Sequence, residues 1–268
     1  MTTYLDRILA VHRAAAATRR LSAGDLRERS AAAAALPPAR GFDAALRADA
    51  RAGHLAVIAE IKRRSPSKGD LHAGLDPAEV ARAYMSGGAA CLSVLTDEDF
   101  FGGSAADLRA ARAAVALPVL RKDFTVDDLD VVEAREMGAD CVLLIAAALD
   151  DAELARLHRL AVEVGLDALV EIHDEGELDR ALAVGATLIG VNQRDLVTFE
   201  VDTDRAVRMA PLMPPGVVRV AESGVRGPAD AARLADAGYH AVLVGESVVT
   251  AGDHSGAVAA LRAMAHST

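Results

Sequence analysis

The segment LAVIAEIK, residues 55–62, is a run of apolar residues that ends in two charged side chains, Glu60 and Lys62. Four later apolar runs also end in ionisable residues or glycine: LRKD at 120–123, LVEI at 169–172, AESG at 221–224 and LVGE at 243–246. Polar groups directly after buried strands are typical of the face of a parallel barrel where enzymes of that fold place their active sites. The five segments therefore predict a catalytic barrel.

From residue 55 onward, short apolar runs alternate with amphipathic stretches, which is the pattern of parallel strands covered by helices. We predict strands near 55–61, 90–95, 117–121, 140–145, 167–172, 187–191, 217–221 and 241–244. The helices are expected near 76–86, 104–115, 127–137, 150–164, 174–184, 202–210, 228–237 and 254–264.

A repeated glycine supports a count of eight units. Glycine closes a predicted helix just before a strand at 88, 138, 185 and 238, and glycine adopts the left-handed conformation at a helix end at little cost. An open, doubly wound sheet shares the alternation, but the regularity of the units favours closure. We predict an α/β fold in which residues 51–268 form a (β/α)8 TIM barrel, a fold whose usual length is close to the 268 residues of this chain.

Residues 1–50 are predicted to be a helical N-terminal extension packed on the barrel. Leu5, Ile8, Leu9 and His12 recur at helical spacing, and an alanine-rich stretch ends at the prolines 37–38, which break a helix.

The composition of the chain indicates where the protein is located and which partners it lacks. Apolar residues make up 52%, but no uninterrupted apolar run approaches the roughly 20 residues of a membrane span. The polar residues after Met1 do not form a secretory signal, and a net charge of -10 disfavours nucleic acid as a partner. Cys91 and Cys141 begin apolar runs, as buried free thiols do. We expect a cytoplasmic protein without membrane or nucleic-acid partners, and a monomer, because the strand pattern leaves no extended exposed apolar patch.

Charged residues end every second predicted strand. Glu60, Lys122, Glu171 and Glu222 end strands one, three, five and seven, and alternate strands contribute side chains to one layer inside a barrel. Lys62 lies two residues beyond Glu60 and points to the same side. Each charge alone fits a solvated strand end, but burying such a set is too costly without a function. The glutamates would hold each lysine protonated, and the lysines would keep enough glutamates ionised to act as bases.

Two further segments offer groups for a ligand. Asn192 can hydrogen-bond a substrate, and the planar fork of Arg194 suits a carboxylate, although a surface pair with Asp195 is the alternative. The basic loop at 63–69 resembles a flap over an anionic ligand, or a flexible linker.

The ends of strands seven and eight predict a phosphate site. Ser223-Gly224 and Gly245-Glu246-Ser247 supply backbone amides, and a short helix is expected near Glu246.

We expect no metal and no cofactor. The sequence has neither a P-loop nor a dinucleotide fingerprint, and its histidines lack a paired ligand spacing. The acidic run Asp97-Glu98-Asp99 is interpreted as a solvated loop, and His173 as a residue that is satisfied locally.

Seven ordered motifs resemble the indole-3-glycerol phosphate synthase family, and they span essentially the whole chain. They are VIAEIKRRSPSKG at 57–69, SVLTDEDFFGGS at 93–104, PVLRKDF at 118–124, ALVEIH at 168–173, IGVNQRDL at 189–196, AESGVRG at 221–227 and AVLVGES at 241–247. The resemblance implies a carboxy-lyase of tryptophan biosynthesis. Its phosphorylated substrate would be 1-(2-carboxyphenylamino)-1-deoxyribulose 5-phosphate, which is closed to indole-3-glycerol phosphate with loss of carbon dioxide and water.

The resemblance also implies roles for individual residues. Lys122 would be the general acid, Glu171 would stabilise the cationic intermediate, and Glu60 with Lys62 would assist ring closure and dehydration. The remaining matched positions would contact substrate: Asn192, Arg194 and Glu222 at the anthranilate and hydroxyl groups, Ser65, Ser223, Gly224 and Gly245 at the phosphate, with Phe124, Glu246 and Ser247 nearby. The sequence departs from the family pattern at Gln193 and Glu246.

Three other functions compete with this one. A Schiff-base aldolase would need Lys122 as a neutral amine, which neighbouring carboxylates oppose. A sugar-phosphate isomerase could use the same fold without releasing gas. A non-catalytic binding protein would be expected to have lost some of the charged residues at the barrel mouth, and here none is missing.

Overall fold

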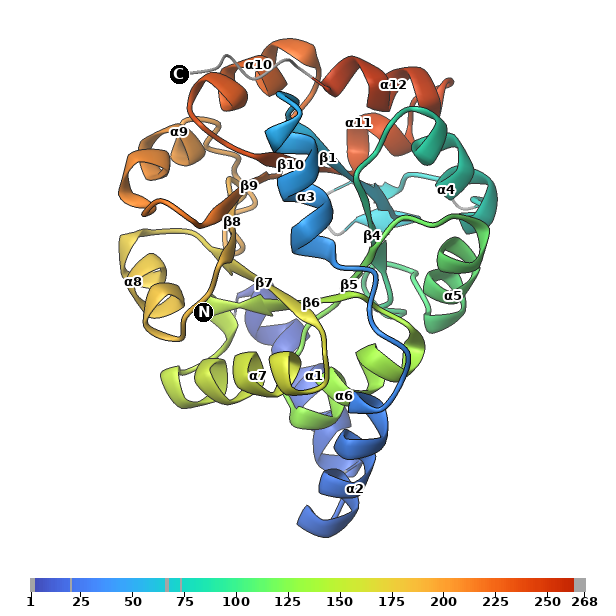
Figure 1. Cartoon of the computed structure of the whole chain (residues 1–268), viewed down its shortest axis with the longest axis vertical. Helices are drawn as coiled ribbons and strands as arrows, with labels where there is room; N and C mark the ends of the chain where they lie inside the picture. Colours follow the sequence, from blue (N-terminus) through green and yellow to red (C-terminus); the bar gives the residue numbers. More distant parts are fainter. Residues whose placement is uncertain (1–2, 20, 66–67, 73, 263–268) are drawn as a thin grey trace.

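The structure is a computed structural model that describes residues 3–19, 21–65, 68–72 and 74–262. Eight parallel strands close into a barrel. They are β1 (Ala56–Ile61), β4 (Cys91–Leu95), β5 (Val119–Lys122), β6 (Cys141–Ile145), β7 (Asp167–Ile172), β8 (Leu188–Asn192), β9 (Val218–Glu222) and β10 (Ala241–Val244). They follow one another around the barrel in chain order, and β10 pairs with β1 to close it (Figure 1). Closure confirms the predicted barrel and rules out the open sheet.

Helices form a ring around the strands (Figure 1). They are α4 (Pro77–Ser86), α5 (Ala105–Ala114), α6 (Asp128–Met137), α7 (Asp151–Glu163), α8 (Glu175–Ala183), α9 (Arg205–Met209), α10 (Pro228–Asp236) and α12 (His254–Leu261). The helix predicted at 202–210 is shorter than expected and continues as a 3₁₀ turn, Ala210–Leu212, which contains Pro211. The last two residues of the helix predicted at 254–264 lie outside the described residues.

The repeated glycines behave as predicted. Gly88, Gly138, Gly185 and Gly238 have φ of +85°, +97°, +80° and +87°. Each ends a helix by turning the chain sharply toward the next strand, which is the conformation that favours glycine.

The alternation of β1 decides which of its side chains enter the barrel. Ala56 and Ile58 belong to the cluster that fills the barrel interior, whereas Val57 and Ala59 pack against the outer helices. Glu60 has the same parity as Ile58, so the strand period of two directs its carboxylate inward at the carboxyl end. Leu120, Leu169 and Val220 in the same interior cluster direct Lys122, Glu171 and Glu222 in the same way.

Three helices precede the barrel: α1 (Tyr4–Thr18), α2 (Ala23–Ala34) and α3 (Phe42–Arg51). Helix α2 ends before the two prolines, as expected. Helix α3 crosses the amino-terminal end of the barrel, in front in Figure 1, and the fully buried side chains of Phe42 and Leu46 join the interior cluster. The extension thus packs on the barrel; its standing as a separate domain of residues 1–50 stays a prediction.

The two cysteines are free and buried, as predicted, and both lie in the interior cluster. None of the helices in the described part of the chain combines the length and apolar character that crossing a membrane requires.

Candidate active site

A cavity of about 530 Å³ opens at the carboxyl ends of the strands. This is the face where barrel enzymes carry out their chemistry. Its lining includes every residue that the sequence marked for the site: Glu60, Lys62, Ser65, Lys122, Phe124, Glu171, Asn192, Arg194, Glu222, Ser223, Gly224, Gly245, Glu246 and Ser247.

Lys122 lies among carboxylates from alternate strands. Its Nζ is 3.8 Å from Oε2 of Glu171 and 4.0 Å from Oε2 of Glu222. Burial alone lowers the pKa of Lys122, but the charges of Glu171, Glu222 and Glu60 outweigh it and raise the pKa above its ordinary value. Lys122 is therefore a protonated donor at neutral pH.

Glu60 and Lys62 form a second pair in the cavity. Lys62 Nζ donates to Oε1 of Glu60 over 2.5 Å, which shows that both side chains point to the same side. Burial raises the pKa of Glu60, yet the charges of Lys62 and Lys122 lower it overall, so Glu60 is ionised. Ser93 of β4 donates to the other oxygen of Glu60.

Glu222 behaves differently from Glu60. Its carboxyl is 2% exposed, and burial, followed by the charge of Glu171, raises its pKa well above the ordinary value despite Lys122. A proton on Glu222 leaves two carboxylates and two ammonium groups among these five residues. The layer is then electrically balanced, which is the arrangement that burial favours.

Two glycines make room for the carboxylates. A Cβ on Gly190 of β8 would lie 2.1 Å from Oε1 of Glu222, and a Cβ on Gly245 would lie 2.4 Å from Oε1 of Glu60. Any larger residue at either position would displace an acidic group. A glycine inside a predicted strand, as at 190, signals this kind of close approach.

Asn192 and Arg194 are held by protein contacts. Asn192 Nδ2 donates to Oε1 of Glu171 over 3.1 Å, and its Oδ1 accepts from the backbone of Arg194. Arg194 Nη1 donates to the carbonyl of Phe199 rather than pairing with Asp195, whose side chain accepts from backbone amides. Asn192 therefore orients Glu171, and Arg194 lines the cavity above it.

The turn after β9 has an unusual backbone. Ser223 has φ of +64°, a region that residues other than glycine rarely adopt, and Gly224 follows with φ of +76°. Gln193, 1% exposed, donates from Nε2 to the carbonyl of Ser223 over 2.7 Å. Gln193 thus supports this turn, a role that its position in the sequence did not signal.

Glu246 opens the expected short helix, α11 (Glu246–Val249), and pairs with Lys68 over 2.8 Å. Lys68 and Ser65 line the cavity as the flap hypothesis requires, but Arg63 pairs with Asp107 and Arg64 donates to the carbonyls of Glu98 and Asp99. Two short strands, β2 (Arg64–Ser65) and β3 (Gly69–Asp70), form this loop; Pro66 and Ser67 lie outside the described residues.

The interpretation of the acidic run as solvated is right for Glu98 and Asp99 but wrong for Asp97. Asp97 is 5% exposed, lines the cavity and accepts backbone hydrogen bonds from Phe100 and Phe101. Its other oxygen contacts His12 of helix α1. His173 does have a local partner, Glu177, but its Nε2 also lies 3.7 Å from Oε1 of Glu171.

Comparison with known proteins identifies the family. The family model described as indole-3-glycerol phosphate synthase matches residues 5–261. The chain belongs to the indole-3-glycerol phosphate synthase family. The predicted family and enzyme class, a decarboxylating, ring-closing lyase of tryptophan biosynthesis that acts on a small phosphorylated substrate, are thereby confirmed.

Similar proteins carry the same description. Indole-3-glycerol phosphate synthase of Nocardioides sp. is 61% identical over 78% of this chain and 80% of that protein. The enzyme of Mycobacteroides abscessus is 52% identical over 97% of this chain and 93% of its own length. Among solved structures, thiamine phosphate pyrophosphorylase from Pyrococcus furiosus aligns with a TM-score of 0.58 at 16% identity, covering 77% of this chain and 93% of that one. That likeness concerns the fold alone.

Proposed function

We propose that this enzyme converts 1-(2-carboxyphenylamino)-1-deoxyribulose 5-phosphate to indole-3-glycerol phosphate, with Lys122 as the general acid. The observation that carries the proposal is the position of the Lys122 ammonium within about 4 Å of two glutamate carboxyl groups inside one cavity. A proton donor there can serve a carbonyl oxygen that becomes negatively charged as a bond forms to its carbon.

We assign the two ends of the substrate from the barrel topology. The phosphate is placed at the turns after β9 and β10, where Ser223, Gly224 and Gly245 supply backbone amides. Strand β5 lies opposite β9 in the barrel. Phe124 follows β5, and its aromatic ring lies near that of Phe101. The aromatic ring of the substrate is therefore placed against the two phenylalanines, and the ketone lies between, within reach of Lys122.

Ring closure forms a bond between the ring carbon that carries the carboxylate and the ketone carbon. Lys122 gives its proton to the ketone oxygen, which becomes a hydroxyl. The nitrogen lone pair of the substrate compensates the electron demand, and the resulting iminium is stabilised by Glu171, held by Asn192. Carbon dioxide then leaves, and its bonding electrons return to the ring.

Dehydration completes the indole. An acid protonates the new hydroxyl, a base removes the proton from the neighbouring carbon, and water departs as the double bond forms. The Glu60–Lys62 pair offers an ionised base and a cation 2.5 Å apart for this step. One proton is taken up overall, because a carboxylate is replaced by carbon dioxide.

The test is the appearance of indole fluorescence when the ribulose phosphate is added to purified protein without added metal. Equimolar release of carbon dioxide is expected. Turnover of phosphoribosylanthranilate without gas release would instead support a sugar-phosphate isomerase. Borohydride trapping of a carbonyl substrate on Lys122 would support the aldolase, although the raised pKa of Lys122 opposes it.

The proposal also covers the cellular location, the oligomeric state and the partners of the enzyme. We place it in the cytoplasm as a monomer without a nucleic-acid partner, in keeping with its net charge of -10. Light scattering of the purified protein tests the oligomeric state.

A further inference from the structure

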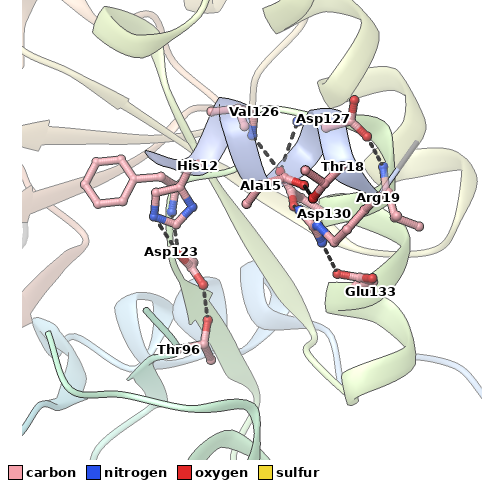
Figure 2. Close-up of polar contacts among 12 residues, drawn as sticks. His12, Ala15, Thr18, Arg19, Thr96, Asp123, Val126, Asp127, Asp130 and Glu133 are labelled. Atoms are coloured by element: carbon pink, nitrogen blue, oxygen red, sulfur yellow. Dashed lines mark hydrogen bonds and ion pairs between the residues drawn. The ribbon is translucent and has the colours of Figure 1, made fainter. Parts of the chain in front are cut away.

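Helix α1 contributes a histidine, His12, to the contacts at the mouth of the barrel. Nε2 of His12 lies 2.9 Å from Oδ2 of Asp97 and 3.9 Å from Oδ1 of Asp123, and the side chains of both aspartates are almost fully covered. Figure 2 shows the imidazole of His12 facing Asp123. These two aspartates follow β4 and β5, so one ring on the extension contacts two loops of the active-site face.

The two aspartates in turn accept hydrogen bonds from the backbone amides of three phenylalanines. Oδ1 of Asp97 accepts from the amides of Phe100 and Phe101, and Oδ1 of Asp123 accepts from the amide of Phe124 over 2.8 Å. Phe101 and Phe124 line the cavity. The ring of His12 also lies 5.3 Å from that of Phe124. His12 therefore stands behind the aromatic wall and does not line the cavity itself.

The oxygens of this cluster are already occupied by hydrogen-bond donors. Oδ2 of Asp123 accepts from the hydroxyl of Thr96 and from Arg121, and Oδ2 of Asp97 faces His12. His12, Asp97 and Asp123 have the ligand types of a metal site. Since all four carboxylate oxygens have protein partners, an imidazolium that donates from Nε2 fits better than a cation that needs free oxygens.

We propose that His12 is a positioning residue for substrate binding, which in its protonated form joins Asp97 to Asp123 and so fixes the wall formed by Phe101 and Phe124. The proposal rests on the proposed function, because it assigns this wall to the aromatic end of the substrate. Its consequence is that affinity for substrate depends on the charge of a residue outside the cavity.

The charges around His12 keep it protonated. Burial lowers its pKa, but the hydrogen bond to Asp97 and the charges of Asp123, Asp97 and Asp130 raise the pKa overall above the ordinary value. Of these groups, Asp123 is also paired with Arg121, and Asp130 of α6 is paired with Arg19, the residue that caps the carboxyl end of α1. The imidazolium is present below the raised pKa and is lost as the pH rises through it.

Other anchors keep α1 in place when His12 changes. Arg19 pairs with Asp130 and Glu133, as Figure 2 shows, and Arg13 pairs with Glu153 of α7. A variant of His12 is therefore expected to lose the fixed wall without losing the helix.

The experiment measures KM and kcat for the ribulose phosphate from about pH 6 to about pH 9, a range that covers a histidine with a raised pKa. In the unaltered enzyme, KM is expected to rise as His12 loses its proton. In His12→Gln, KM at low pH is expected to be about tenfold higher than in the unaltered enzyme, which is the effect of losing a hydrogen bond to a charged group. The KM of this variant is not expected to rise further with pH. His12→Lys keeps a cation at every pH, so its KM is expected to stay low. In all variants kcat is expected to change little.

The matched control is His158→Gln on helix α7, away from the cavity, which should keep the original profile. Equal KM profiles for the unaltered enzyme and His12→Gln would overturn the proposal. So would equal losses in His12→Lys and His12→Gln, because the charge would then be irrelevant. If His12→Gln does not fold, the comparison of His12→Lys with the unaltered enzyme at high pH decides. Activity that a chelator removes and zinc restores, in the unaltered enzyme but not in His12→Gln, would also overturn it. Absence of turnover in the unaltered enzyme would refute the proposed function instead.

Discussion

Replacing Lys122 by methionine removes an ammonium group from between two buried carboxyl groups while keeping a side chain of similar length. The charges of Lys122 and Glu171 are 3.8 Å apart. At an effective dielectric constant of about 20, a pair at this separation interacts by roughly 4 kcal/mol before desolvation is counted. This value is an upper bound for the destabilisation, because the variant also relieves the lysine of its desolvation cost.

The effect on catalysis is expected to be larger than the effect on folding. A positioned general acid contributes about 10²- to 10⁴-fold to the rate, or roughly 3 to 5 kcal/mol of transition-state stabilisation. We expect Lys122→Met to lose at least this factor in kcat. Affinity for the phosphate group should remain, because the turn at Ser223 and Gly224 follows the opposite strand, β9.

The assay is indole fluorescence under saturating substrate, combined with thermal unfolding at about pH 7 to measure the loss of stability. Inorganic phosphate serves as a competitive probe of the phosphate end. Arg159→Met, which removes a cation from an exposed position on α7, is the control for lost charge. A folded Lys122→Met enzyme that retains a tenth of its activity or more would refute the assignment of Lys122 as the acid.

Three further outcomes follow from the geometry. Gly190→Ala should fold but lose at least about tenfold in kcat, because the added Cβ displaces the Glu222 carboxyl. Gly252→Ala is the control and should keep its kcat, because a Cβ there enters open space. Steady-state kinetics of both variants tests this prediction. The raised pKa of Glu222 means that the folded state holds a proton that the unfolded state releases above its ordinary pKa, so this contribution to stability is lost as the pH rises. Glu222→Gln should therefore gain melting temperature relative to the unaltered enzyme as the pH increases, and a constant difference would contradict the assignment. A lysine-acylating reagent should modify exposed Lys68 and spare Lys122, whose pKa is raised; mass spectrometry of the digest distinguishes the two.

The strands and their inward side chains were predictable because both follow from short-range patterns. An apolar run bounded by glycine fixes a strand within a residue or two, and a period of two then sends Glu60 or Lys122 into the barrel. Predicting that the sheet closes into a barrel required only the number of strand–helix units and their regular spacing. The helix predicted to begin at 202 begins only at 205, because the backbone amide of Asp202 donates to the carbonyl of Gln193 instead, a contact that a periodic pattern does not reveal.

Contacts between distant segments were not predictable from the same patterns. The acidic run at 97–99 looks solvated in sequence, since nothing local shows that His12, 85 residues earlier, covers Asp97. Gln193 likewise gives no local sign that it holds the carbonyl of Ser223. The protonation of Glu222 depends on the mutual distances of three side chains from three strands, and therefore on coordinates rather than on spacing along the chain.

The positively charged residues of the cavity differ in type from those in the rest of the protein. All three lysines of the sequence, at 62, 68 and 122, line the cavity. Ion pairs elsewhere in the described residues use arginine or histidine, as in Arg13 with Glu153. Arginine forms strong bidentate pairs but does not release a proton at neutral pH, whereas lysine is a compact charge that can. A site that must protonate a carbonyl oxygen and then recover its proton requires lysine, and the neighbouring carboxylates ensure that Lys122 begins each turnover charged. An arginine at this position would preserve the charge balance of the layer but not the reaction, so Lys122→Arg should be as inactive as the methionine variant while matching the unaltered enzyme in stability.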